Sequence, residues 1–143
     1  MNTRGIFCGL VAAVLLAACA SPGPPGRSET CTAAQCELDV SVVGSPPRVR
    51  VNIETLTVRG NRNVAIAWNL KSDQYEFKDD SIQFYDPRAA REFSAPTAGE
   101  KGAQVRLTNR NSEKGEWGYQ IKVYEKATGK WIPLDPAIFN DGG

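Results

Sequence analysis

The chain of 143 residues contains no histidine, and its single methionine is Met1. Histidine is the commonest general base in enzymes and a frequent metal ligand, so its absence excludes a Ser-His-Asp triad and a Cys-His pair. Without histidine or an internal methionine, the usual ligands of a copper-handling protein are missing as well. We therefore expect a protein that is not an enzyme and that holds no cofactor.

The chain also lacks an excess of charge of either sign, with 17 Lys and Arg against 16 Asp and Glu. Nucleic acids bind proteins through a basic footprint that neutralises phosphates, so this balance argues against a nucleic-acid partner. The charges are unevenly spread, because residues 44–71 carry five cations and one carboxylate, whereas residues 72–100 carry seven carboxylates and three cations. We interpret this pattern as solvated faces and loops, with a polar binding face as the alternative.

The sequence has no apolar run that reaches the roughly 20 residues a membrane-spanning helix needs. One uncharged run begins at Ile6, follows the basic Arg4, and ends in the small residues Ala17 and Ala18. A basic start, a short apolar middle and a small-residue end are the layout of a secretory signal peptide. The sequence therefore predicts that residues 1–18 are a cleaved leader.

The end of this run, Leu16-Ala17-Ala18-Cys19, resembles the lipobox of bacterial lipoproteins. The resemblance implies cleavage before Cys19, a diacylglycerol on its sulfur and an acyl chain on its new amino group. Two or more acyl chains hold a protein stably on a membrane. The next residues are Ala20 and Ser21, and the lack of an aspartate there implies, by the same resemblance, the periplasmic leaflet of the outer membrane. The alternative is an ordinary signal peptide, cleaved after Ala18, that leaves Cys19 as an unmodified thiol.

Residues 19–30 are rich in Pro, Gly and Ser and show no apolar periodicity. This composition is typical of a semi-extended linker. We therefore expect a tether between the lipidated cysteine and a folded domain at residues 31–143.

Cys31 and Cys36 are the two thiols that remain after the leader and the lipidation site. An even pair in an oxidising compartment predicts a disulfide, here one that closes a short loop and clamps the first strand of the domain. The alternative is a metal site, but two cysteines fall short of the four ligands of a structural zinc.

Alternation with a period of two residues dominates the sequence after Glu37 and predicts a series of short strands. Their apolar positions are Leu38, Val40 and Val42; Val49, Val51, Ile53, Leu56 and Val58; Val64, Ile66, Trp68 and Leu70; Ile82 and Phe84; Phe93; Val105 and Leu107; Trp117, Tyr119, Ile121 and Val123; Trp131 and Ile132. Helical spacing is limited to one turn at residues 87–92, and Asp135-Pro136 is expected to precede a final apolar plug of Ile138 and Phe139. The pattern predicts a single all-β domain, a Greek-key β-sandwich of about seven strands.

Trp68, on an early central strand, resembles the buried core tryptophan of immunoglobulin domains, which implies an immunoglobulin-like sandwich. The disulfide that joins the two sheets in those domains is missing from its usual place, because Cys31 and Cys36 both precede Trp68. Residues 66–70, 107–111, 119–123 and 134–140 together resemble a group of uncharacterised secreted bacterial proteins. That resemblance implies no activity.

Two surfaces are candidates for contact with an anionic polymer or a protein partner. The outward strand positions would present Arg48, Arg50, Gln104, Arg106, Gln120 and Lys122, and the loop tips would present Arg59, Asn61, Arg62 and Asn111. Residues 109–112 are expected to shape a turn through local hydrogen bonds. A calcium site is a further alternative for Asp73, Glu76, Asp79 and Asp80, but their spacing differs from that of the calcium-binding loop, so we expect a solvated loop.

These features predict a membrane-anchored lipoprotein on the periplasmic face of the outer membrane. Its sandwich would be a non-catalytic binding or structural module of the cell envelope, with an envelope protein as its partner. One alternative is a periplasmic inhibitor or immunity protein that blocks an envelope hydrolase by inserting a loop. Another is an enzyme that uses carboxylates, which would need two of them facing each other across a cleft.

Overall fold

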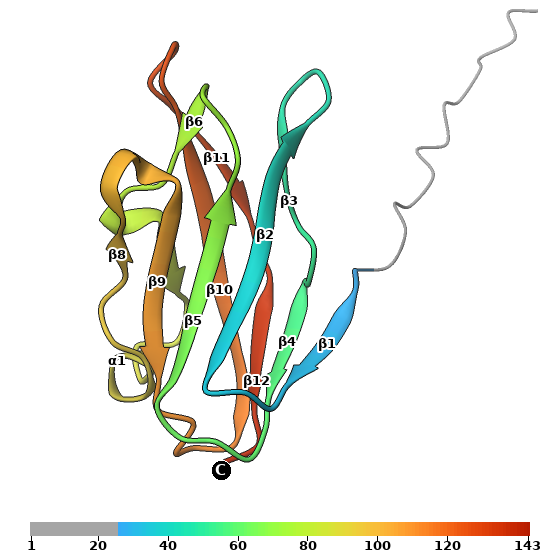
Figure 1. The fold of residues 1–143 in the computed structure, drawn as a ribbon, viewed down its shortest axis with the longest axis vertical. Helices are drawn as coiled ribbons and strands as arrows, with labels where there is room; N and C mark the ends of the chain where they lie inside the picture. Colours follow the sequence, from blue (N-terminus) through green and yellow to red (C-terminus); the bar gives the residue numbers. More distant parts are fainter. Residues whose placement is uncertain (1–25) are drawn as a thin grey trace, which may run out of the picture.

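The computed structural model describes residues 26–143, which form two β-sheets packed face to face (Figure 1). The seven-stranded sheet consists of β1 (Ser28–Cys31), β4 (Thr55–Val58), β6 (Tyr75–Glu76), β7 (Ile82–Phe84), β10 (Gly115–Glu125), β11 (Lys130–Leu134) and β12 (Ala137–Asn140). The five-stranded sheet consists of β2 (Gln35–Val43), β3 (Arg48–Val51), β5 (Val64–Leu70), β8 (Thr97–Ala98) and β9 (Gln104–Asn109). The helical segments are α1 (Ala89–Glu92), η1 (Asp79–Ser81) and η2 (Glu100–Gly102).

The strand order is β3-β2-β5-β9-β8 in the five-stranded sheet and β1-β4-β12-β10-β11 in the seven-stranded sheet. Strands β6 and β7 pair with the long strand β10 along the edge opposite β11. Three neighbouring pairs are parallel, namely β1 with β4, β4 with β12, and β2 with β5. Both sheets are therefore mixed.

The period-two pattern places every second side chain between the sheets, because successive side chains of a strand point to opposite faces. On β2, for example, Leu38 and Val40 are buried while Glu37 and Asp39 are exposed. The same alternation on β3, β9 and β10 supplies the facing side chains. The inward residues of both sheets join in one core.

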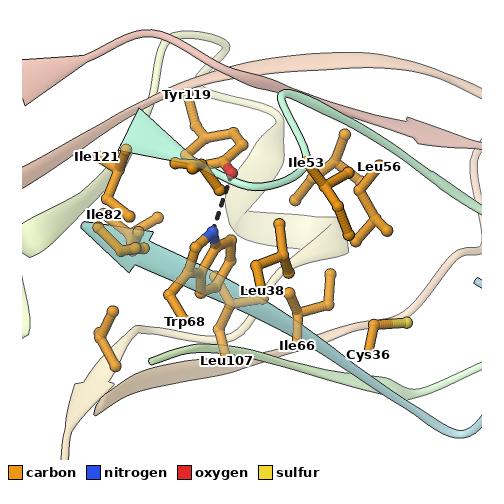
Figure 2. Close-up of a cluster of buried hydrophobic side chains, with 14 of the residues drawn as sticks. Cys36, Leu38, Ile53, Leu56, Ile66, Trp68, Ile82, Leu107, Tyr119 and Ile121 are labelled. Atoms are coloured by element: carbon orange, nitrogen blue, oxygen red, sulfur yellow. Dashed lines mark hydrogen bonds between the residues drawn. The ribbon is translucent and has the colours of Figure 1, made fainter. Parts of the chain in front are cut away.

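Trp68 on β5 and Tyr119 on β10 meet at the centre of this core, one from each sheet (Figure 2). The Trp68 indole N–H donates a hydrogen bond of 3.0 Å to the Tyr119 hydroxyl, and the two rings pack edge to face. Burial of the hydroxyl raises the pKa of Tyr119, so it stays protonated. The prediction that Trp68 is a core residue is confirmed.

The expected all-β sandwich is confirmed, but the expected number of about seven strands is wrong, since residues 26–143 contain twelve. Several of the additional strands are short, such as β6 and β8 with two residues each. The three parallel pairs also differ from the antiparallel sheets of the immunoglobulin-like arrangement that the sequence suggested. The turn of helix expected within residues 87–92 is present as α1.

Residues 48–58 were expected to continue one alternating pattern, and here the structure differs. Strand β3 pairs with β2 in one sheet, whereas β4 pairs with β1 and β12 in the other. The chain crosses between the sheets at residues 52–54, and Ile53 is buried at the crossing. The buried positions are Val49, Val51 and Ile53 before the crossing and Leu56 and Val58 after it, so the alternation shifts by one residue where the chain changes sheets.

The expectation of a terminal plug formed by Ile138 and Phe139 is wrong. These residues belong to β12, which lies between β4 and β10 in the middle of the seven-stranded sheet. Neighbouring side chains of a strand point to opposite faces. Ile138 is therefore fully buried in the core, whereas Phe139 lies on the outer face and is 38% exposed.

The disulfide between Cys31 and Cys36 is present, with a Cα–Cα distance of 6.1 Å. It joins β1 of one sheet to β2 of the other, so it links the two sheets as well as closing a short loop. Because β1 begins at Ser28, the sandwich starts earlier than the expected boundary at residue 31, and the tether prediction is wrong for residues 28–30.

The predicted leader, residues 1–18, and the predicted lipidation site, Cys19, lie outside the described residues. Among residues 26–143, none of the helical segments has the length and apolar character that crossing a membrane requires.

Candidate functional site

The six basic residues predicted to form a binding surface lie in three separate places. These are the outer face of the five-stranded sheet, the loop between β4 and β5, and the outer face of the seven-stranded sheet. Arg48 and Arg50 project from the edge strand β3, and Arg106 projects from β9. All three lie on the outer face of the five-stranded sheet, the face turned away from the seven-stranded sheet. Strands β2 and β5 separate the two groups, so the arginines do not form one continuous basic patch.

Polar side chains of β2, β5 and β9 occupy the middle of this outer face. The Gln104 amide donates a hydrogen bond of 2.8 Å to the Asn69 side-chain oxygen, and the Asn69 amide lies 3.4 Å from a Glu37 carboxylate oxygen. Glu37 and Arg106 stand on either side of Ala67 in the strand register. The face is therefore of mixed charge, with basic groups toward its two sides.

Arg59 and Arg62 lie in the loop between β4 and β5, as the sequence suggested, but each has a partner from the end of the chain. Arg59 lies 3.9 Å from an Asp141 carboxylate oxygen, and the Arg62 guanidinium donates a hydrogen bond to the Gly143 carbonyl. The arginines therefore help to hold the C-terminal residues against this loop.

Asn111 was predicted to be exposed at a loop tip, and this prediction is wrong. Its side chain is fully buried and donates to the Asn61 carbonyl at 2.9 Å and to Asp141 at 3.0 Å. Its backbone N–H bonds to the Asn109 side chain at 2.9 Å, which confirms the expected local hydrogen bond of a turn. Asn111 also has a φ of 49°, a left-handed conformation that asparagine tolerates better than most residues.

Lys122 does not join the other predicted binding residues, because it lies on the outer face of the seven-stranded sheet. Its ammonium group is 3.0 Å from Asp80 and 4.3 Å from the centre of the Trp131 ring, and its side chain is only 15% exposed. A lysine that is paired and covered in this way contributes to packing more than to recognition. Lys122 therefore lies apart from the arginines with which it was predicted to form a surface.

Three of the four acidic residues considered as a calcium site have separate partners. Asp79 accepts a hydrogen bond of 2.8 Å from the Ala98 amide, Glu76 lies 3.4 Å from Lys78, and Asp80 pairs with Lys122. Within residues 26–143, no three acidic or cysteine side chains converge as metal ligands would.

A buried polar cluster at the end of the sandwich near α1 was not predicted. Glu92 ends α1 and is only 3% exposed, and Asn109 and Asn140 are completely buried. The two asparagines exchange hydrogen bonds of 2.7 and 3.1 Å, and the Asn140 amide lies 3.4 Å from Glu92. The cluster joins α1, β9 and β12, which come from distant parts of the chain.

The Glu92 carboxylate is stabilised in its charged form. It accepts hydrogen bonds from the Ser112 hydroxyl and from the Ser112 amide, the latter at 2.9 Å. Burial alone would raise the pKa of Glu92, but these bonds, the Glu113 amide and the charge of Arg110 together lower it below the ordinary value of a glutamate. A carboxylate with a lowered pKa is a weak base. We therefore interpret Glu92 as a structural residue and not as a general base.

The signal for this cluster was present in the alternating pattern. Asn109 continues the inward series of Val105 and Leu107, and Asn140 continues the inward position of Ile138. A polar residue at an inward position requires a buried partner. The sequence therefore marks both asparagines as unusual, but it does not show that they are partners of each other.

The Glu92→Gln variant tests this assignment through pH. A carboxylate whose pKa is lowered on folding stabilises the protein above its unfolded pKa, and this contribution is lost as pH falls through its folded pKa. At pH 7 we expect the variant to lose about 1 kcal/mol of unfolding free energy, a modest value because Ser112 is at the exposed surface. The difference from the wild type should shrink as pH falls below the ordinary glutamate pKa.

Urea denaturation at a series of pH values measures this effect. Glu116→Gln is the matched control, because Glu116 is an exposed glutamate on β10 and the charge change is identical. Equal losses in both variants, or a difference that does not change with pH, would contradict the role of Glu92.

An apolar hollow of about 370 Å³ lies beside α1, next to the cluster. Phe84 and Phe93 stack in its wall with ring centres 4.1 Å apart, and Asp86 is the charged residue among those that line it. Asp86 is already bound by the Arg88 guanidinium at 2.7 Å, which lowers the pKa of its carboxyl group. The hollow therefore offers apolar contact but no free charged group to orient a ligand.

No protein-family model matches the chain, and a search of curated proteins finds no relative.

Proposed function

We propose that this chain is a lipoprotein of the bacterial envelope, anchored through Cys19 in the periplasmic leaflet of the outer membrane. The sequence Leu16-Ala17-Ala18-Cys19 at the end of a short apolar run carries this proposal. Two or more acyl chains on one cysteine are enough for stable attachment to a membrane. The Pro- and Gly-rich residues 20–27 would then connect the anchor to β1.

The sandwich is, in this proposal, a non-catalytic binding or structural module. Support for a non-catalytic role comes from Glu92, the most deeply buried carboxylate. Its hydrogen bonds join structural elements to one another. The proposed contact surface is the outer face of the five-stranded sheet. Arg48, Arg50 and Arg106 are exposed there, and none of them belongs to the ion pairs found within residues 26–143. An envelope protein with carboxylates at a matching spacing would fit this face.

Replacement of Cys19 by alanine tests the anchor. In cells fed an alkyne analogue of palmitate, the wild-type chain should incorporate the label and the Cys19→Ala variant should lose it completely. Cys8→Ala is the matched control, because Cys8 lies in the same apolar run and should not affect labelling. Label on the Cys19→Ala variant, or none on the wild type, would refute the anchor. Crosslinking in whole cells, followed by pull-down from the membrane fraction, then identifies the partner.

A further inference from the structure

Strand β1 connects the N-terminal segment to the sandwich and forms one edge of the seven-stranded sheet (Figure 1). It pairs with β4 alone, with Ser28 opposite Thr55 and Cys31 opposite Val58. Its side chains at positions 28–30 are all exposed, and only Cys31 packs against the core. Because apolar burial is the main force that docks a strand, β1 gains little stability from its side chains.

Besides the disulfide, mainly backbone hydrogen bonds at the sheet edge hold β1. Arg59 donates to the Cys31 carbonyl at 3.0 Å, and Glu54 donates to the Arg27 carbonyl at 2.8 Å. Each of these hydrogen bonds can be exchanged for one with water and contributes only about 1 kcal/mol net. The covalent link from Cys31 to Cys36 on β2 is therefore the restraint on the position of β1 that water cannot replace.

The disulfide is open to attack from solvent. It lines a hollow of about 310 Å³ between β1 and β2, together with Glu29, Glu37, Ile53 and others. Cys31 is partly exposed, whereas Cys36 is only 5% exposed. Cys31 is thus the more exposed of the two cysteines. The two carboxylates in the lining oppose the approach of a reductant that carries carboxylates of its own, which favours one whose only charge is the attacking thiolate.

We propose that the Cys31–Cys36 disulfide is a redox-controlled latch, and that its reduction releases β1 while the two packed sheets stay folded. The reductant is a dithiol with no charged group other than its attacking thiolate. Its first sulfur, as a thiolate, attacks Cys31 Sγ and breaks the S–S bond, and the departing Cys36 thiolate takes up a proton. Its second sulfur then displaces Cys31 from the mixed disulfide as a thiol. Two electrons pass from the dithiol to the cystine, and the reductant leaves as a cyclic disulfide.

Release of β1 lengthens the segment that would join Cys19 to the sandwich. In the oxidised protein this segment ends where β1 begins, at Ser28, and in the reduced protein it extends to Gln35, the first residue of β2. An extended residue spans about 3.5 Å, so the reach grows by roughly 25 Å. This consequence rests on the proposed anchor at Cys19, whereas the release of β1 does not.

Hydrogen exchange followed by mass spectrometry tests the latch. The full chain in detergent is measured before and after treatment with dithiothreitol, a dithiol of this kind. We expect exchange in β1 to rise at least about tenfold on reduction, while exchange in β5 and β9 stays within about twofold, because only a local opening is involved. Unchanged exchange in β1 would overturn the proposal, and so would loss of protection in all strands together.

A Cys31→Ser/Cys36→Ser variant provides a second measurement and should show the exchange of the reduced wild type. If this variant does not fold during synthesis, reduction of the folded wild type still decides the question. Exchange in β1 can be measured whether or not Cys19 carries a lipid. Failure of the anchor and failure of the latch are therefore separate results.

Discussion

Replacement of Trp68 by alanine is expected to lower the free energy of unfolding by about 3 to 5 kcal/mol, the usual cost of emptying a large aromatic site in a core. Trp68 is completely buried, and in the register of its sheet it lies between Leu38 and Val105. Its ring also meets Tyr119 of the opposite sheet, with centroids 5.5 Å apart. The substitution therefore leaves a cavity where the two sheets pack.

The Tyr119→Phe variant separates the hydrogen bond from the packing. It keeps the ring of Tyr119 but removes the acceptor of the Trp68 indole N–H, which is 3.0 Å away. A buried donor left without a partner costs about 1 to 3 kcal/mol, so this variant should be less damaged than Trp68→Ala. Urea denaturation followed by far-ultraviolet circular dichroism measures both. A Trp68→Ala variant with an unchanged midpoint would contradict the described core.

Replacement of Ile138 by alanine should cost about 2 to 5 kcal/mol, the range for a large aliphatic side chain removed from a core. Ile138 is fully buried on β12 and stands between Leu56 of β4 and Trp117 of β10. Because β12 connects β4 to β10 in the sheet order, loss of packing at this position weakens the middle of the seven-stranded sheet.

Phe139→Ala is the control for this substitution, since it removes a larger side chain from the adjacent residue. Phe139 is 38% exposed on the outer face, and its loss should cost less than about 1 kcal/mol. Thermal or urea unfolding of the two variants gives the comparison. If the Phe139 variant were the more destabilised, the orientation of β12 would be wrong.

The positions of the strands were largely predictable from the sequence, whereas their partners were not. The alternation that marks residues 38–42 and 64–70 depends only on which face of a strand is buried. Between Val49 and Val58 the alternation shifts by one residue after Ile53, which marks the end of one strand but does not show that the chain passes to the other sheet there. Both sheets bury side chains in the same core, so a local pattern contains no information about which sheet a residue joins.

The candidate binding surface shows the same limit, namely that a local pattern does not identify the sheet to which a residue belongs. Arg50, Arg106 and Lys122 all occupy positions between apolar residues, and the alternation correctly turned them away from the core. The sequence could not show that Lys122 belongs to the opposite sheet and is paired with Asp80, a residue 42 positions away. Ion pairs of this kind depend on the folded chain, because they join residues that the sequence leaves far apart.

The sequence by itself determined that residues 31–143 are all-β, that Trp68 is in the core, and that Cys31 and Cys36 form a disulfide. These features follow from local periodicity, from hydrophobicity and from the presence of two cysteines within residues 31–143. Tertiary structure alone decided that β12 lies inside a sheet, that Asn109 meets Asn140, and that the disulfide links an edge strand to the other sheet. Each of these depends on contacts between distant segments, which form only when the chain folds.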